Sequence, residues 1–342
     1  MHTETPPLCA STATSIAAAP PACLQFAPWD NTLLAVGTYS LHEHETAPEK
    51  HRTGSLELYR LSTARTAAQL KHLHSLPTPG GAVLDIKFCG GALAAALSCG
   101  AIALYAIAAA TATADERIVL RDTLQLFPPD VLVLSLAPLP GLETGGVLAC
   151  TRSDGGVAIV DLATGRLRSE YVPHTLEAWT CEWAGGGGGQ TLYSGGDDAV
   201  FVVLDVRSGA EVARSRRGAH DAGVTALLAR GVGGEQLCSG SYDEGLRVWD
   251  LRGTAVRPVD RLGLGGGVWR LQQMPQAAEG RVLASCMHAG ARVVDVGTGR
   301  PEVVARWEDN GSMNYGSHVH ADAPQRVASC SFYDRRVCIW SI

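Results

Sequence analysis

An excess of basic residues is missing from this chain. Its 342 residues include 28 Lys and Arg against 34 Asp and Glu, which gives a formal net charge of −6. A protein that binds nucleic acid needs a basic face to displace counterions from phosphate, so the composition argues against a nucleic-acid partner. A mildly acidic surface is better suited to a basic or cationic partner.

The motifs of several large enzyme classes are missing as well. The sequence contains no G-x-S-x-G elbow, no H-E-x-x-H zinc motif, no Walker loop and no dinucleotide fingerprint. The glycine run 185–189 has no helical pattern after it that could cradle a phosphate, so we interpret it as a loop. The histidines in the charged segment 42–52 lack a defined ligand geometry. We therefore expect neither a cofactor nor a bound metal.

Paired cysteine motifs and a secretory leader are also lacking. The ten cysteines are scattered without a C-x-x-C pair, and residues 1–20 have no basic stretch followed by a leucine-rich one. In a chain of this length such cysteines behave as small core residues in a reducing compartment. The sequence therefore predicts free thiols and a cytoplasmic location.

One segment lacks charge over a length that could span a bilayer. Residues 90–114 carry no charged side chain. They are mostly Ala, Gly, Ser and Thr, which transfer weakly into a membrane, and the turn residues 98–100 interrupt the run. We expect a buried hairpin here and no membrane association.

What the sequence does contain is a recurring four-stranded unit. Residues 224–252 show an apolar strand, a Gly-rich turn, a strand that ends in Ser-Gly-Ser, an acidic hairpin and a strand that ends in Trp249-Asp250. First strands are expected to begin near Cys23, Val83, Val133, Ala178, Val224, Val268 and Met313. A repeat of about 45 residues with a Trp-Asp dipeptide is typical of propeller blades. Residues 1–342 are thus predicted to form one all-β, seven-bladed WD-repeat propeller.

Two segments depart from the repeat. The last unit ends directly after its third strand, so it lacks an outermost strand. Residues 11–20 are expected to supply that strand, because closing the ring removes exposed strand edges. Residues 42–53 are interpreted as a charged surface loop inserted in the first unit.

Several polar residues fit a structural role better than a catalytic one. The hydrogen-bonded tetrad that stiffens a WD-repeat blade is matched by His220, Ser239 or Ser241, Asp243 and Trp249. A Ser/His/Asp set also suggests a hydrolase triad, but the spacing favours the tetrad. Asp197 and Asp198 lie in a hairpin, where Asp commonly caps its own turn.

The later units place unusual side chains in their loops. Loops that enter first strands, and loops that join second to third strands, emerge on the same face of a propeller. The residues at these positions are Glu177, Trp179, Trp269, Arg270, His288, Tyr315, Tyr333 and Asp334. We expect them at one mouth of the central channel, on loops that a rigid scaffold displays. Aromatic rings with carboxylates suit a quaternary ammonium group, whereas the alternative is that each ring packs against its neighbouring blade.

Motifs in the later four units resemble the diphthine methyl ester hydrolases, the WD-repeat proteins of diphthamide biosynthesis. The matching stretches are H-x-x-E-A-W at 174–179, S-G-G-D-D at 194–198, SYDEGLRVWDLR at 241–252, LGGGVWRL at 264–271, CMHAG at 286–290, SMNYG at 312–316 and SCSFYD at 329–334. The first three units match only as generic repeats. The family continues N-Y-G with an acidic residue and Trp, where this chain has Ser317-His318-Val319.

The resemblance implies hydrolysis of the methyl ester on the modified histidine of translation elongation factor 2, which gives diphthine for later amidation to diphthamide. It implies this elongation factor as a partner, together with other enzymes of the pathway. The trimethylammonium group of diphthine suits an acidic and aromatic mouth. The alternatives are a non-catalytic scaffold that binds a protein and a peroxisomal import receptor that binds targeting peptides.

Ester hydrolysis needs an activated water or nucleophile, a general base and donors for the developing oxyanion. We expect His288 to be the base, oriented by Glu177 or Asp334. Arg270 or the amides of 265–267 are expected to stabilise the oxyanion.

The remaining candidates are substrate contacts and a thiol. The substrate is expected to be bound by Trp179, Trp269, Tyr315, Tyr333 and Asp198. Cys286 is a candidate nucleophile, but its second-strand position predicts a buried and inert thiol.

Overall fold

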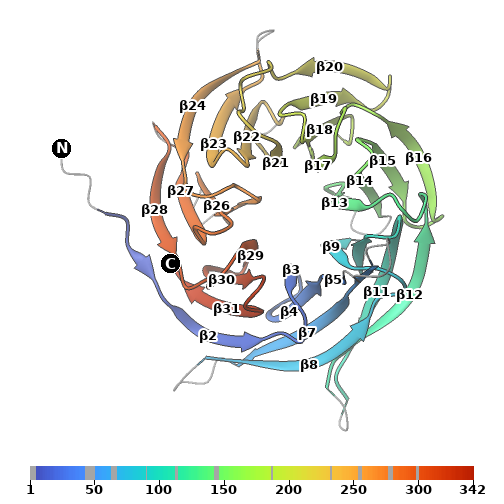
Figure 1. Cartoon of the computed structure of the whole chain (residues 1–342), viewed down its shortest axis with the longest axis vertical. Coiled ribbons are helices and arrows are strands. Elements are labelled where there is room, and N and C mark those ends of the chain that lie inside the picture. The colour runs from blue at the N-terminus through green and yellow to red at the C-terminus, as the bar shows by residue number, and fades with distance from the viewer. Residues whose placement is uncertain are drawn as a thin grey trace.

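The computed structural model describes residues 5–42, 51–62, 68–89, 91–111, 115–141, 146–185, 188–231, 233–252, 256–275, 280–297 and 300–342. Within these ranges the regular structure consists of β-strands, and no helix occurs. Seven of the sheets that these strands form are arranged as blades around a central axis (Figure 1). The prediction of a seven-bladed propeller is therefore confirmed.

Each blade contains four antiparallel strands, and we number the blades in chain order. Blade 1 consists of β3 (Pro21–Ala27), β4 (Asp30–Thr38), β7 (Ser55–Ser62) and β8 (Gln69–Pro77). Blade 2 consists of β9 (Val83–Cys89), β10 (Ala92–Leu97), β11 (Ala101–Ala108) and β12 (Arg117–Gln125). Blade 3 consists of β13 (Val133–Pro138), β14 (Val147–Arg152), β15 (Val157–Asp161) and β16 (Arg166–Tyr171). Blade 4 consists of β17 (Ala178–Trp183), β18 (Thr191–Gly196), β19 (Phe201–Asp205) and β20 (Ala210–Arg214).

The last three blades follow the same plan. Blade 5 consists of β21 (Val224–Arg230), β22 (Gln236–Ser241), β23 (Gly245–Asp250) and β24 (Arg257–Gly263). Blade 6 consists of β25 (Arg270–Gln273), β26 (Arg281–Ser285), β27 (Ala291–Asp295) and β28 (Glu302–Trp307). Blade 7 contains β29 (Asn314–His320), β30 (Ala323–Ser331) and β31 (Arg336–Ser341). The first strand of each blade lies toward the axis and the fourth lies at the rim (Figure 1).

The N-terminal segment joins the two ends of the ring. β2 (Ser11–Ile16) pairs antiparallel with β31 and is the outermost strand of blade 7. β1 (Leu8–Cys9) adds to the edge of β28 as a parallel strand. In Figure 1 the segment runs along the outer edge beside the C-terminal strands. A strand from the N-terminal segment thus completes the blade formed by the C-terminal strands, and this closes the ring of blades.

Two further segments can be compared with the sequence. The hairpin of β5 (Ser40–His42) and β6 (His51–Thr53) forms the ends of the segment 42–53, while residues 43–50 lie outside the described residues. The uncharged segment 90–114 contains β10 and β11, which pair antiparallel, so the predicted buried hairpin is confirmed. In the described ranges no helix is long and apolar enough to cross a membrane.

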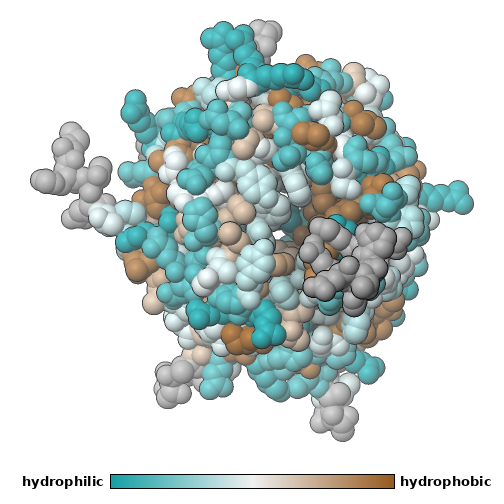
Figure 2. All heavy atoms as spheres, in the orientation of Figure 1, coloured by the Kyte–Doolittle hydropathy of each residue, from teal (hydrophilic) through white to brown (hydrophobic). Residues whose placement is uncertain are grey.

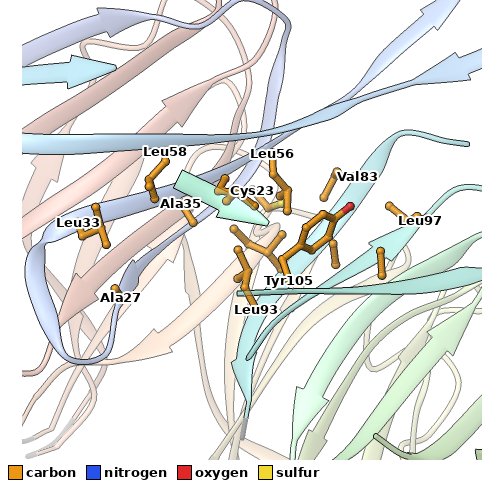
Figure 3. Close-up of a cluster of buried hydrophobic side chains, with 14 of the residues drawn as sticks. Cys23, Ala27, Leu33, Ala35, Leu56, Leu58, Val83, Leu93, Leu97 and Tyr105 are labelled. Carbon is orange, nitrogen blue, oxygen red and sulfur yellow. The ribbon is translucent and has the colours of Figure 1, made fainter. Parts of the chain in front are cut away.

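The hydrophobic core is divided among the contacts between neighbouring blades. Among the described residues we find seven buried clusters, each of which joins the facing sides of two consecutive blades, including blades 7 and 1. Figure 3 shows the cluster between blades 1 and 2, where Leu56, Leu58 and Cys23 face Val83, Leu93 and Tyr105. Because every blade buries apolar side chains on both sides, the ring is a stiff frame for the loops at its mouth. On the face shown in Figure 2, hydrophobic residues are dispersed among hydrophilic ones.

The second strands approach the next blade closely at a glycine. A side-chain carbon at Gly240 would overlap Val268 of blade 6, and one at Gly195 would lie 2.7 Å from Val224 of blade 5. This close approach explains the glycine in the repeated Ser-Gly motif, because a larger residue would push the blades apart.

The structural tetrad expected in blade 5 forms only in part. In blade 5 His220 Nε2 and Trp249 Nε1 both lie 2.8 Å from Ser239 Oγ. The expected fourth member, Asp243, pairs with Arg247 instead, and buried His220 Nδ1 has no partner among the described residues. The prediction that Asp243 completes this tetrad was therefore wrong, because an arginine on the third strand, at position 247, captures the carboxylate.

Candidate functional site

Aromatic rings from four blades line one end of the central channel. Trp269 lies between Trp179 and Tyr315, with ring centroids 5.5 and 5.2 Å away, and Tyr242 packs on it at 5.6 Å. The row continues from Tyr315 to Phe332 at 5.3 Å. We call these five residues the aromatic arc. All come from the starts of first strands or from turns between second and third strands, so the expectation that such loops share one mouth agrees with these contacts.

Glycines bring two loops of the mouth together. A side-chain carbon at Gly266 would overlap the Cys286 carbonyl, and one at Gly267 would lie 2.6 Å from Met287 Sδ. Trp269 N–H donates to the Ser285 carbonyl at 2.8 Å. The Gly-Gly-Gly-Val-Trp segment is therefore packed flat on the hairpin that carries His288, and this packing sets the position of the Trp269 ring.

His288 is exposed at the tip of this hairpin. Asn310 Nδ2 donates to the His288 carbonyl at 3.2 Å and to the Met287 carbonyl at 3.3 Å. Asn314 N–H donates to the Met287 carbonyl at 2.9 Å. Met287 has a φ of +43°, a left-handed conformation that a non-glycine residue rarely adopts. The backbone is thus held firmly, while the imidazole is free to contact a bound molecule.

The two acidic residues expected to orient His288 make other contacts. Asp334 Oδ2 accepts from the Gly311 N–H at 2.9 Å and lies 3.3 Å from Arg336 Nε, while Oδ1 is buried without a partner among the described residues. Glu177 is partly buried, and its carbonyl accepts from the Asp197 N–H at 2.8 Å. Asp334 therefore anchors the loop entering blade 7, and no contact joins either carboxylate to His288 in the described structure.

Tyr333 and Asp198 have different surroundings. Tyr333 is 70% exposed, packs edge-on against Phe332 at 5.0 Å and donates its N–H to Ser312 Oγ at 2.7 Å. Asp198 Oδ1 instead lies 3.0 Å from Nδ1 of buried His174, whose Nε2 lies 2.9 Å from Ser194 Oγ. Tyr333 therefore extends the mouth outward, whereas Asp198 belongs to a set of three hydrogen-bonded side chains in blade 4, in which Leu204 occupies the position that Trp249 holds in blade 5.

Sequence reasoning missed three side chains of the mouth. Asp197 Oδ1 accepts a 2.9 Å hydrogen bond from Trp179 Nε1 and so fixes the indole. Tyr242 and Phe332 belong to the aromatic arc. Asp197, Tyr242 and Phe332 occupy the same position in their hairpins, so a blade-by-blade alignment of the motifs SGGDD, SGSYD and SCSFY could have identified them.

Below the arc the channel forms a polar cavity of about 220 Å³. Among the residues that line it are Tyr315, Arg270, Asp85, Lys87, Glu182 and His318. Arg270 lies here rather than at the rim, because it follows Trp269 inward along β25. No sequence pattern distinguishes the channel residues on β9 and β17, since a charged residue that alternates with apolar ones has the same pattern whether it faces a channel or solvent.

Burial changes the protonation of two channel residues. Burial raises the pKa of Glu182 to about 7, and nearby Lys87 opposes this shift. Burial lowers the pKa of His318 to about 3, with Lys87 adding to the effect. At neutral pH the His318 imidazole is therefore neutral and Glu182 is partly protonated.

The thiol and metal expectations can also be compared with the structure. Cys286 is buried, and burial raises its pKa to about 12, so it is a poor nucleophile. All ten cysteines are free, as predicted. In the part of the chain that the structure describes, no group of three or more His, Cys, Asp or Glu side chains could hold a metal ion.

Comparison with known proteins places these features in context. No protein-family model matches the chain. It is 33% identical over 316 residues to a protein of Schizosaccharomyces pombe named diphthine methyltransferase, an alignment that covers 90% of each chain. It is 24% identical over 361 residues to a diphthine methyltransferase homolog of Dictyostelium discoideum, covering 93% of this chain and 95% of that one.

Two further similarities agree with this assignment. The human diphthine methyltransferase is 28% identical over 297 residues, which cover 77% of this chain and 62% of that protein. Among solved structures, a chain in a crystal structure of the mitotic checkpoint complex superposes with a TM-score of 0.73 over 100% of this chain and 94% of that one. That chain is only 14% identical, so it supports the propeller fold alone.

Proposed function

Because this chain belongs to the family of the proteins named diphthine methyltransferase, we propose that it is an enzyme that acts on diphthine. We further propose that it hydrolyses the methyl ester of diphthine methyl ester on translation elongation factor 2. The product would be diphthine, whose free carboxylate is available for amidation to diphthamide. The propeller face that carries the mouth is the proposed contact for the elongation factor.

The observation that carries this proposal is the aromatic arc above a polar channel. A trimethylammonium group is a large, weakly hydrated cation that binds the faces of Trp and Tyr rings. Trp269, in contact with three other rings, offers such a surface at the centre of the mouth. Asp197, bonded to the Trp179 indole, adds negative charge beside it. An ester carried on the same substituent would then lie near Arg270, at the top of the cavity.

We assign the following roles to the residues around this position. His288 accepts a proton from water, and the resulting hydroxide attacks the ester carbonyl carbon. Arg270 or the amides of 265–267 stabilise the oxyanion that develops. The bond to the methoxy oxygen then breaks, and the protonated imidazole returns its proton so that methanol leaves. Asp334 contributes by anchoring the loop of blade 7, and Glu177 by adding negative charge near Trp179.

The experiment must separate hydrolysis from methyl transfer, because the relatives are named methyltransferases. Purified protein is incubated with methyl-esterified elongation factor 2 without any methyl donor, and the intact mass of the factor is followed. We expect the mass to fall by one CH₂ group. A mass that rises only when a donor is added would indicate transfer instead, and an unchanged mass with stable binding would indicate a scaffold.

A further inference from the structure

A buried carboxylate in the channel, that of Asp85 on β9, is tied to four partners. Oδ1 accepts from the Ile86 N–H at 3.0 Å and from Lys87 Nζ at 3.3 Å. Oδ2 accepts from the Leu136 N–H at 2.9 Å and from Arg270 Nη1 at 3.3 Å. Because the side chain is only 2% exposed and two backbone groups of blades 2 and 3 bind it, the carboxylate is fixed in one position.

Arg270 reaches this carboxylate from the opposite side of the ring. It begins β25 in blade 6, whereas Asp85 and Leu84, whose carbonyl accepts from Nη2 at 3.3 Å, belong to blade 2. Blades 7 and 1 lie between these two blades (Figure 1), so the side chain crosses the channel. It is 20% exposed and lines the same cavity as Tyr315.

Comparison with Arg247 shows that Arg270 is incompletely bonded. Arg247 is 1% exposed and binds both oxygens of Asp243, at 2.5 and 3.0 Å. Arg270 uses two of the five guanidinium donors, each at 3.3 Å, within the described residues. A guanidinium with unused N–H donors at a cavity surface can donate hydrogen bonds to the oxygens of a carboxyl or ester group.

We infer that Asp85 is a positioning residue that holds the Arg270 guanidinium across the channel, where it binds the carboxyl oxygens of the ligand. The inference rests on the proposed function and specifies how one site recognises two groups. Tyr315 of the aromatic arc lines the same cavity as Arg270, and its ring lies 5.2 Å from the ring of Trp269. A ligand that carries an ammonium and a carboxyl group on one carbon can therefore reach the aromatic arc and the guanidinium together.

The competing explanation is that the Asp85–Arg270 pair only fastens blade 2 to blade 6. Buried ion pairs are weak contributors to net stability, although removing one partner is costly. A purely structural pair would change the free energy of unfolding in its variants. It would leave unchanged the preference for ligands that carry a carboxyl group.

The first test measures binding of two small probes by tryptophan fluorescence. Trimethylglycine carries both groups, whereas tetramethylammonium carries the cation alone. We expect Asp85→Asn and Arg270→Ala to weaken trimethylglycine binding by about tenfold or more, the effect of losing a hydrogen bond to a charged group, and to leave tetramethylammonium binding unchanged. Arg230→Ala is the matched control, because Arg230 also joins blades 5 and 6 but bonds Gln273 and the Val296 carbonyl.

The second test is chemical rescue of turnover on methyl-esterified elongation factor 2. Ethylguanidinium should restore part of the activity lost in Arg270→Ala, but not in the double variant with Asp85→Asn, which has no anchor for the added ion. The urea midpoint of each variant shows whether it is folded. If Arg270→Ala does not fold, the nearly isosteric Asp85→Asn still tests the inference.

The outcomes separate this inference from the proposed function. If the wild-type protein binds trimethylglycine through Arg270 and Asp85 but does not hydrolyse the ester, the proposed function fails and the positioning role stands. The inference is overturned if the wild type does not discriminate between the two probes, or if Asp85→Asn binds both as the wild type does. Rescue of equal size with and without Asp85 would also overturn it.

Discussion

Trp269 offers the most informative single substitution at the mouth. Its ring lies 5.5 Å from Trp179, 5.6 Å from Tyr242 and 5.2 Å from Tyr315. Trp269→Ala removes the central surface of the aromatic arc, while Trp269→Phe keeps a smaller ring in the same place. If the arc binds a trimethylammonium group, the two variants should lose affinity in graded steps.

The size of the effect follows from the cation–π interaction. A desolvated cation on Trp contributes about 2 kcal/mol, which corresponds to about 30-fold in affinity because about 1.4 kcal/mol is tenfold. The ammonium charge does not change during hydrolysis, so the interaction is equal in the ground and transition states. Its loss should raise KM by about 30-fold for Trp269→Ala, with little effect on kcat. Trp269→Phe should raise KM by less than about tenfold.

The assay is steady-state hydrolysis of methyl-esterified elongation factor 2. Trp29→Ala is the matched control, because Trp29 is 57% exposed in the turn between β3 and β4, at the opposite end of the first strands, and contacts Phe88. Each lost ring contact can cost about 0.5–1.5 kcal/mol of stability, so urea unfolding must show that the variants are folded. A folded Trp269→Ala with wild-type KM would refute a cation site on the arc.

Three further predictions concern turnover, packing and pH. His288→Ala should lower kcat by at least about 100-fold, as expected for loss of a general base, and wild-type turnover in the folded variant would exclude this role. Gly240→Ala should lower the free energy of unfolding by about 1–3 kcal/mol because its methyl group overlaps Val268. The control is Gly263→Ala, which has open space around it and should change the urea midpoint little. Equal urea midpoints for the two variants would contradict the packing argument. Burial lowers the pKa of His220 to about 4, below its ordinary value near 6.5, so the unfolded chain binds the proton first as pH falls. Stability should therefore drop by about 2 kcal/mol between pH 6.5 and 5, and His220→Gln should flatten this slope in urea titrations; an unchanged slope would rule out His220 as its source.

The repeat of about 45 residues made the fold predictable. The strand boundaries and the hydrogen-bonded side chains of each blade were less predictable, because they depend on neighbouring residues as well as on spacing. Four first strands begin at the predicted residues, but β25 begins at Arg270 rather than Val268, because Val268 and Trp269 bond the carbonyls of Ser241 and Ser285 in the loop between blades. A His-Ser-Asp set with nearly the same spacing occurs in blade 4, where the Asp198 carboxylate bonds His174, whereas in blade 5 the Asp243 carboxylate pairs with Arg247 instead of His220. One neighbouring arginine decides the difference, and spacing alone does not reveal it.

The candidate site was predictable at the rim and not in the channel. Trp269 and Tyr315 stood out because a blade does not require aromatic residues at those turns, and their rings are in contact. Asp85 and Glu182 did not stand out, because a charged side chain that faces the channel and one that faces solvent give the same alternating pattern in a strand. Their significance depends on contacts across the ring, which connect residues as far apart in sequence as Asp85 and Arg270.

The most direct test of ester hydrolysis follows the oxygen atom of water. Methyl-esterified elongation factor 2 is incubated with the protein in water enriched in oxygen-18, and both products are analysed by mass spectrometry. Attack of water on the carbonyl carbon predicts one heavy oxygen in the new carboxylate of the factor and none in the released methanol. Heavy oxygen in the methanol, or no methanol at all, would contradict the account.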